Sequence, residues 1–151
     1  MLKTKIPPPV YMLLFGIAMY FLAKAFPSPV LLEPVERSIG YAFAALALLL
    51  GFSAILQFFK SKTTVNPIKP QNTRTIVNKG MYRFSRNPMY LGLFFWLVAW
   101  AIYLAVPAPF LLLPVFIWLI TVMQIIPEEK VLEEKFGDDY LNYKKQVRRW
   151  I

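Results

Sequence analysis

The chain contains four long runs of apolar residues, and these runs decide what it can fold into. About 20 consecutive apolar residues form a helix long enough to cross a bilayer. Because lipid offers no partner for backbone N–H and C=O groups, such a segment satisfies them within its own helix. We therefore predict an all-α, polytopic membrane helical bundle with about four transmembrane helices, at residues 10–26, 38–59, 89–106 and 110–126.

Shorter signals predict how these helices pack. The third and fourth runs are separated by Pro107-Ala108-Pro109, which indicates a tight antiparallel helical hairpin. Pro114, inside the fourth run, predicts a local kink. Small residues in the second run allow another helix to approach closely. They are Gly40, Ala44, Ala47 and Gly51.

The composition limits the chemistry that is open to this chain. Its 151 residues suit one membrane-embedded domain, residues 1–151, and include neither cysteine nor histidine. A disulfide, a thiol nucleophile, an imidazole base and an ordinary zinc site are therefore excluded, and we predict no metal. Any acid–base work falls to carboxylates, tyrosines, lysines or water.

The net charge of +9 comes from basic residues that lie beside the apolar runs, which favours anionic lipid headgroups over nucleic acid as a partner. By the positive-inside rule, both termini, the loop at residues 60–88 and the tail at residues 127–151 face the cytoplasm. The basic residues of the loop, which has no acidic residue, are Lys60, Lys62, Lys69, Arg74, Lys79, Arg83 and Arg86.

The start of the third helix carries polar residues that have two interpretations. Asn87 precedes Pro88, and this pair is typical of a helix N-cap followed by a first helical residue. The free N–H groups of a helix start also suit a carboxylate ligand, with Tyr82 and Tyr90 close by. Gly92 would then let a ligand approach the backbone.

Two adjacent carboxylates, Glu128 and Glu129, follow Pro127 directly at the end of the fourth apolar run. Acidic residues in a first helical turn complement the helix dipole, which would explain the pair without a ligand. Carboxylates at a membrane edge also require cationic or hydrogen-bonding partners. A cationic ligand is one such partner, and an arginine from the loop is another.

The tail is predicted to form two amphipathic helical pieces on either side of Gly137. It is either an interfacial anchor or a lid over the cytoplasmic mouth of a site, and the two roles are compatible. Tyr140, Tyr143, Val147 and Trp150 recur at spacings of three and four residues along the second piece, which predicts that they share one face.

From about residue 77 to residue 150, the ordered set of these motifs resembles the phospholipid and isoprenylcysteine carboxyl methyltransferase family. A glycine and a tyrosine come first, then an Arg-Asn-Pro-Met-Tyr motif, a helical hairpin, a pair of glutamates and a Phe-Gly-x-x-Tyr-x-x-Tyr motif. The residues are Gly80 and Tyr82; Arg86, Asn87, Pro88, Met89 and Tyr90; Glu128 and Glu129; Phe136, Gly137, Tyr140 and Tyr143. Asn87 stands where the isoprenylcysteine enzymes have His, and Gln124 where they have a substrate-contacting Arg.

The resemblance implies an integral membrane methyltransferase that uses S-adenosylmethionine. Its acceptor would be lipophilic: a phospholipid amine, an isoprenylcysteine-type carboxylate or another small hydrophobic molecule entering from the bilayer. An amine acceptor must first lose a proton, and Glu128, Glu129 and Tyr90 are the local candidates for the base. The predicted catalytic residues are Glu128, Tyr90 and Asn87. Carried over by position, the cofactor-binding residues are Arg74, Thr75, Ile76, Val77, Tyr82, Asn87, Pro88, Met89, Tyr90, Glu128 and Glu129.

A non-catalytic membrane scaffold or a small transporter subunit is the alternative. Either would explain four spans and basic loops. Neither would explain the ordered polar set, and a transporter places polar residues in the middle of its spans, where this chain has almost none.

Overall fold

The computed structural model describes residues 6–27, 34–60 and 76–151, and this part of the chain is helical with no strand. The longer helices are α1 (Pro8–Ala25), α2 (Pro34–Lys60), α3 (Pro88–Leu104), α4 (Leu112–Ile120), α5 (Ile126–Phe136) and α6 (Asp138–Gln146). Shorter elements join them: the 3-10 turns Gly80–Arg83 and Ala108–Leu111, and a π-turn at Thr121–Ile125. The predicted all-α class is confirmed.

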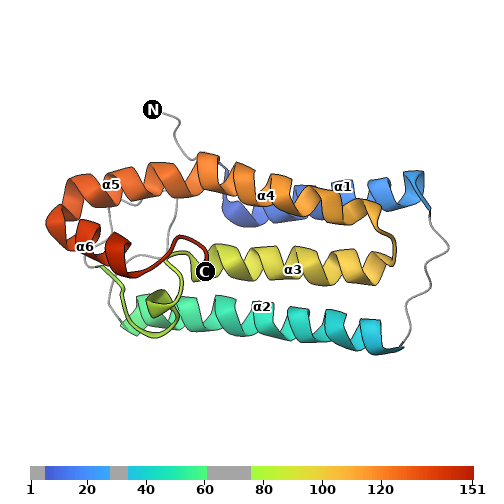
Figure 1. Cartoon of the computed structure of the whole chain (residues 1–151), viewed down its shortest axis with the longest axis horizontal. Coiled ribbons are helices and arrows are strands. Elements are labelled where there is room, and N and C mark those ends of the chain that lie inside the picture. Colours follow the sequence, from blue (N-terminus) through green and yellow to red (C-terminus); the bar gives the residue numbers. More distant parts are fainter. Residues whose placement is uncertain (1–5, 28–33, 61–75) are drawn as a thin grey trace.

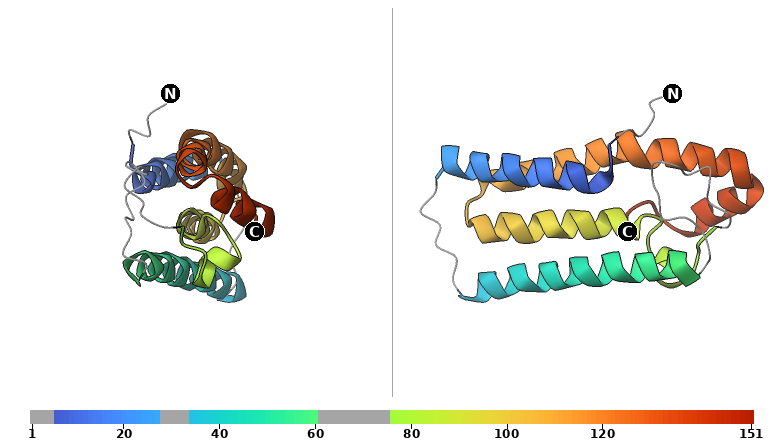
Figure 2. Two further views of the ribbon diagram at one scale, coloured as in Figure 1. Left: turned by 90° about the vertical axis from the view of Figure 1, so that its left-hand side faces the viewer. Right: turned by 180° about the vertical axis from the view of Figure 1, so that it is seen from behind.

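The long helices lie side by side in layers. Figure 1 shows α3 between α2 on one side and the pair α1 and α4 on the other, and the end view in Figure 2 shows the same order. Helix α3 contacts all three of these neighbours, and α2 is its most extensive partner. The helices α5 and α6 continue beyond one end of the bundle, next to the start of α3 (Figure 1).

Three helical segments are long and apolar enough to cross a membrane: Pro8–Ala25, Ser38–Gln57 and Ala108–Phe136. The 17 residues of α3 form a shorter apolar helix, about 25 Å long at 1.5 Å per residue. Outward-facing apolar side chains cover these segments, such as Phe52 at 65% exposure and Trp118 at 64%. In water such surfaces would be costly, so the bundle is built for lipid.

The predicted close approach along the small residues of the second span is confirmed. A Cβ added to Gly40 would lie 3.2 Å from Ile102, and Ala47 is buried. On α3 the matching small residue is Gly92, where an added Cβ would lie 3.1 Å from the Ala47 carbonyl oxygen. Gly92 therefore admits the backbone of α2, and this corrects the prediction that it makes room for a ligand.

Helices α1, α3 and α4 share a separate apolar core. Met19, Ala101 and Phe116 are completely buried in it. The rings of Phe15 and Phe116 pack edge to face, with their centroids 5.3 Å apart. Lipid packing alone gives helices little reason to associate, so interhelical hydrogen bonds matter here. The Trp100 indole N–H supplies one by donating to the Gly16 carbonyl at 3.0 Å.

The apolar span predicted at residues 110–126 continues into the glutamates as one helical segment from Ala108 to Phe136. Pro114 is the third residue of α4, directly after the 3-10 turn Ala108–Leu111, so it lies where 3-10 bonding changes to α-helical bonding. A second departure from α-helical bonding comes at the π-turn, where the Ile126 N–H donates to the Thr121 carbonyl five residues earlier. Pro127 follows this wider turn, which relieves the clash of its ring with the preceding turn.

The predicted division of the tail is confirmed at Gly137, whose φ of +52° separates α5 from α6. Tyr140, Tyr143 and Val147 lie in one buried cluster, as their spacing predicts. Trp150 leaves that face because the chain becomes extended at Val147. Its ring packs against the bundle core, and its indole N–H donates to Thr121 Oγ1 at 3.2 Å.

Candidate functional site

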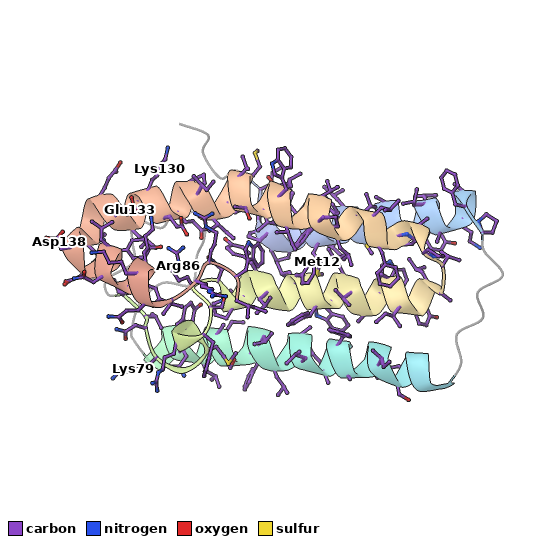
Figure 3. The ribbon with its side chains drawn as sticks, in the orientation of Figure 1. Met12, Lys79, Arg86, Lys130, Glu133 and Asp138 are labelled. Carbon is purple, nitrogen blue, oxygen red and sulfur yellow. The ribbon has the colours of Figure 1, made fainter. Side chains whose placement is uncertain are left out.

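The polar residues gather at the end of the bundle where α3 begins and where α5 and α6 fold back. Figure 3 shows Arg86 on the inner side of this region, whereas Lys130 and Asp138 lie on its outer surface. Gly80 helps to shape the region. Its φ is +60°, and a Cβ there would overlap the end of the Gln57 side chain, so the turn at this position favours glycine.

Tyr90 and Glu128 meet across this region although 38 residues separate them in sequence. The Tyr90 phenol donates a hydrogen bond to Glu128 Oε1 at 2.6 Å. At this length it is a short O–H···O hydrogen bond. The contact joins two of the predicted catalytic residues, and it aims the Glu128 carboxylate at the start of α3.

Glu129 has cationic partners on two sides. Arg149 makes a two-pronged contact with it, through Nε to Oε1 at 3.0 Å and Nη2 to Oε2 at 2.7 Å. Arg86 Nη1 lies 3.2 Å from Oε1. Because the fourth helix continues through the glutamates, they do not occupy a free helix start, and dipole compensation does not account for them. The predicted arginine partner is present, and Arg149 adds a second.

Arg86 is deeply buried for an arginine, with only 8% of its side chain exposed. Its Nη1 approaches Glu129 at an angle that makes no hydrogen bond, and neither Nε nor Nη1 has a hydrogen-bond partner within the described part of the chain. Tyr140 lies close by. Burial and the Glu129 charge raise the pKa of this phenol, while the charge of Arg86 and a hydrogen bond from it act to lower that pKa.

Asn87 occupies the N-cap position of α3, but its side chain does not cap the helix. Its amide instead donates to the carbonyl of Arg149 at 2.9 Å, in the tail. The backbone N–H of Arg86 likewise donates to the Arg148 carbonyl at 3.0 Å. These bonds fasten the C-terminal residues across the start of α3. The predicted side-chain cap is therefore wrong, because the tail carbonyl takes the amide.

Apolar residues line the region beside these polar groups. Val77, Tyr82 and Ala54 form one buried cluster with Met89 against it, and Ile76 packs on the cluster of tail tyrosines. Burial, then Tyr143 and then Glu128, raise the pKa of Tyr82, so its phenol stays protonated. The Tyr143 hydroxyl donates to the Tyr82 carbonyl at 2.7 Å, which ties α6 to the 3-10 turn.

The structure brings together most of the predicted site residues from Ile76 to Glu129. Pro88 is buried at the first position of α3. Arg74 and Thr75 lie outside the described residues. Two contributors were not predicted as part of the site: Ser85, which accepts a hydrogen bond from the Asn87 N–H, and Arg149. The basic character of the tail pointed to lipid headgroups, and no local pattern marks Arg149 as the partner of Glu129.

Gln124 lies deeper, in the π-turn, and is completely buried. Its Nε2 donates to the Ile6 carbonyl at 2.9 Å, which ties the residues before α1 to the fourth helix. Its Oε1 has no hydrogen-bond partner among the described residues. A side-chain amide in this position is a conspicuous polar group in an otherwise apolar interior.

The arrangement offers carboxylates, phenols and a buried guanidinium within one region at the bundle end. Carboxylates and a guanidinium are groups that suit a ligand with both positive and negative charges, and a carboxylate is a group that can accept a proton. Within residues 6–27, 34–60 and 76–151, no group of three or more His, Cys, Asp or Glu residues could hold a metal ion.

Comparison with known proteins supplies the chemical context. Residues 35–139 match the model of a family described as phospholipid methyltransferase. An uncharacterized protein of Haemophilus influenzae is 46% identical over 63 residues, which cover 42% of this chain and all of that protein.

Two relatives are named protein-S-isoprenylcysteine O-methyltransferase. The Schizosaccharomyces pombe protein is 29% identical over 113 residues, covering 75% of this chain and 48% of the relative. The Saccharomyces cerevisiae protein is 33% identical over 79 residues, covering 52% of this chain and 33% of the relative. The chain thus matches half or less of the length of these relatives. No solved structure matches it significantly.

Proposed function

The chain belongs to the phospholipid methyltransferase family, and from that premise we propose that it transfers a methyl group from S-adenosylmethionine to a lipophilic acceptor. The observation that carries this proposal is the 2.6 Å bond between Tyr90 and Glu128. It joins the Arg-Asn-Pro-Met-Tyr motif to the pair of glutamates in one region. Both motifs lie within residues 35–139, the part that matches the family model.

The side chains at the bundle end fit the chemical groups of this methyl donor. S-adenosylmethionine supplies a methyl group on a positively charged sulfur, and it also carries an ammonium, a carboxylate and ribose hydroxyl groups. A carboxylate has about four lone-pair sites, of which Tyr90 uses one at Glu128. The remaining sites suit hydroxyl and ammonium donors. The apolar cluster of Val77, Tyr82 and Met89 suits a flat purine.

The protein's part in the reaction is mainly alignment and exclusion of water. Tyr90 orients Glu128, which accepts the proton that an amine acceptor must lose before it attacks. A carboxylate acceptor needs no such base. Asn87 contributes by holding the tail across the start of α3. The acceptor reaches the site from the bilayer, between helices with exposed apolar surfaces.

S-adenosylmethionine is soluble, so its site should open to the cytoplasm. The polar region lies at the same end of the bundle as the end of α2, the start of α3 and the tail (Figure 1). Basic residues flank this end, which under the positive-inside rule makes it cytoplasmic. In this proposal the chain is one membrane-embedded domain, with anionic lipid headgroups around the basic tail.

Binding and transfer test the proposal directly. Detergent-purified protein should bind S-adenosylmethionine saturably, and it should transfer radiolabelled methyl groups to a component of a membrane lipid extract. The substitution Glu128→Gln should weaken binding by about 1–3 kcal/mol, the worth of a hydrogen bond to a charged group. Glu134→Gln, at an exposed position on the same helix, is the matched control. Protein that binds no S-adenosylmethionine would point to a scaffold or transporter subunit instead.

Sidedness is tested by single cysteines, since the natural chain has none. Pro27→Cys and Asn78→Cys are at exposed positions, the first just after the end of α1 and the second just before the Gly80–Arg83 turn. The end of α1 and this turn lie at opposite ends of the bundle (Figure 1). An impermeant thiol reagent added to intact cells should label the first and spare the second until the cells are opened. Labelling of both from outside would contradict the proposed orientation.

A further inference from the structure

The buried guanidinium of Arg86 is a group whose charge the fold does not fully compensate. Two arginines, Arg86 and Arg149, face a single carboxylate at Glu129. Arg149 takes the well-formed bonds, to both carboxylate oxygens, although 36% of its side chain is exposed to solvent. Arg86 is left with 8% exposure, a 3.2 Å approach to Glu129 that forms no hydrogen bond, and a hydrogen bond to the Tyr140 phenol, which brings no compensating charge.

Such an arrangement is energetically costly unless something else binds it. A buried charge requires both an opposite charge and hydrogen bonds to its donors. Among the described residues, Arg86 shares the charge of Glu129 with Arg149, and its Nε and Nη1 groups make no hydrogen bond. Water can serve Arg149 at the surface, but it reaches Arg86 poorly. Within the described part of the chain, two donor groups of Arg86 are therefore available to an anion.

A second, independent feature points to the same place. Arg86 precedes α3 by two residues, and this helix of 17 residues begins without a side-chain cap because the Asn87 amide bonds the tail instead. The N–H groups of the first turn carry the positive end of the helix dipole. An anion beside Arg86 would meet these groups as well as the guanidinium.

We propose that Arg86 binds the carboxylate of the amino-acid end of the methyl donor, and that the donor extends from there toward the Tyr90–Glu128 pair. This inference rests on the proposed function and adds the polarity with which the ligand lies in the site. The carboxylate would complete the hydrogen bonds of Arg86. Glu129 would stay bonded to Arg149 and hold the tail in place.

Decarboxylated S-adenosylmethionine separates this inference from general cofactor binding, because it lacks only the carboxylate. Calorimetric titration of the full detergent-purified chain should show about ten- to a hundredfold tighter binding of the intact donor than of the decarboxylated one. Arg86→Gln should bring the intact donor down to the affinity of the decarboxylated one, and it should leave the latter unchanged within about threefold. Arg86→Lys should keep part of the preference, because a lysine retains the charge but loses the planar fork.

Arg83→Gln, at an exposed arginine of the same connection, is the control and should bind both compounds as the unaltered protein does. Equal affinity of the unaltered protein for the two compounds would overturn the inference while leaving methyl-donor binding intact. An equal loss for both compounds in folded Arg86→Gln protein would overturn it too. Failure of the unaltered protein to bind either compound would instead remove the proposed function, and this inference with it. If Arg86→Gln does not fold, the inference is tested by how strongly the unaltered protein and Arg86→Lys prefer the intact donor over the decarboxylated one.

Discussion

The contact between α2 and α3 and the polar end of the bundle are built by different means. Between α2 and α3 the backbones themselves come close at Gly92, which faces the small residues Ala47 and Gly51. At the polar end, long side chains reach across gaps in sequence of 20 to 62 residues, from Arg149 to Glu129 and from Asn87 to the Arg149 carbonyl. The first contact depends on shape and the second on charge and hydrogen bonds.

This difference teaches which changes each region tolerates. Shape-dependent contacts in a membrane fail when atoms are added, since lipid already solvates the apolar surface and only close packing holds the helices together. Charge-dependent contacts fail when atoms are exchanged without any change of volume, because a partner is left buried and unpaired. The substitutions below test the two regions against each other.

The largest effect is expected at the polar end. Glu129→Gln conserves volume but removes the charge that faces Arg86 and Arg149, and breaking a buried ion pair costs about 3–5 kcal/mol. Thermal unfolding in detergent should show this loss. The matched control is Glu133→Gln on the same helix, which removes only a more exposed contact with Lys144 and should cost far less. Equal effects at the two glutamates would contradict the charge-dependent account.

A smaller effect is expected between α2 and α3. In Gly92→Val, the added Cβ would lie 3.1 Å from the Ala47 carbonyl oxygen, and overpacking costs about 1–3 kcal/mol. The matched control is Gly16→Val in α1, where a Cβ meets nothing within 4 Å. Unfolding curves in one detergent should separate the two variants. Similar stability would mean that α2 moves away from α3 at little cost.

Tyr90→Phe should separate function from stability. The ring remains in the apolar core, but the hydrogen bond to Glu128 is lost, which should weaken cofactor binding or lower turnover by about tenfold. Tyr103→Phe is the control, because Tyr103 lies on the same helix with 70% exposure. Titration and turnover should be measured on both variants. Normal values for folded Tyr90→Phe would place this tyrosine outside the site.

The smallest effect is expected at Asn87, where it distinguishes a cap from a tail contact. Serine caps helices about as well as asparagine, so Asn87→Ser would be neutral if capping were the role. Because the amide bonds the Arg149 carbonyl, we expect Asn87→Ser and Asn87→Ala to lose about 0.5–1.5 kcal/mol alike. The unfolding midpoints of the two variants and of the unaltered protein measure this loss. If the serine variant keeps full stability and the alanine variant does not, helix capping is the role of Asn87.

Local sequence patterns predicted the features that depend on near neighbours. The apolar runs indicated the helices, Gly137 indicated the break in the tail, and the small residues of α2 indicated its closest contact. Arg149 was not predicted as the partner of Glu129, because the pairing depends on α6 folding back and on the extended turn at Val147. The same turn carries Trp150 away from the face that its spacing had suggested.

The π-turn at Thr121–Ile125 has a consequence for how such a site can change. One residue more than in an α-helical turn rotates everything that follows by about 100° around the helix axis. The direction in which Glu128 and Glu129 point is therefore set by the number of residues in the apolar segment before them. The side chains of that segment contact mainly lipid and the bundle core. Loss of a single residue there would leave the membrane span intact and turn both carboxylates away from Tyr90 and Arg86.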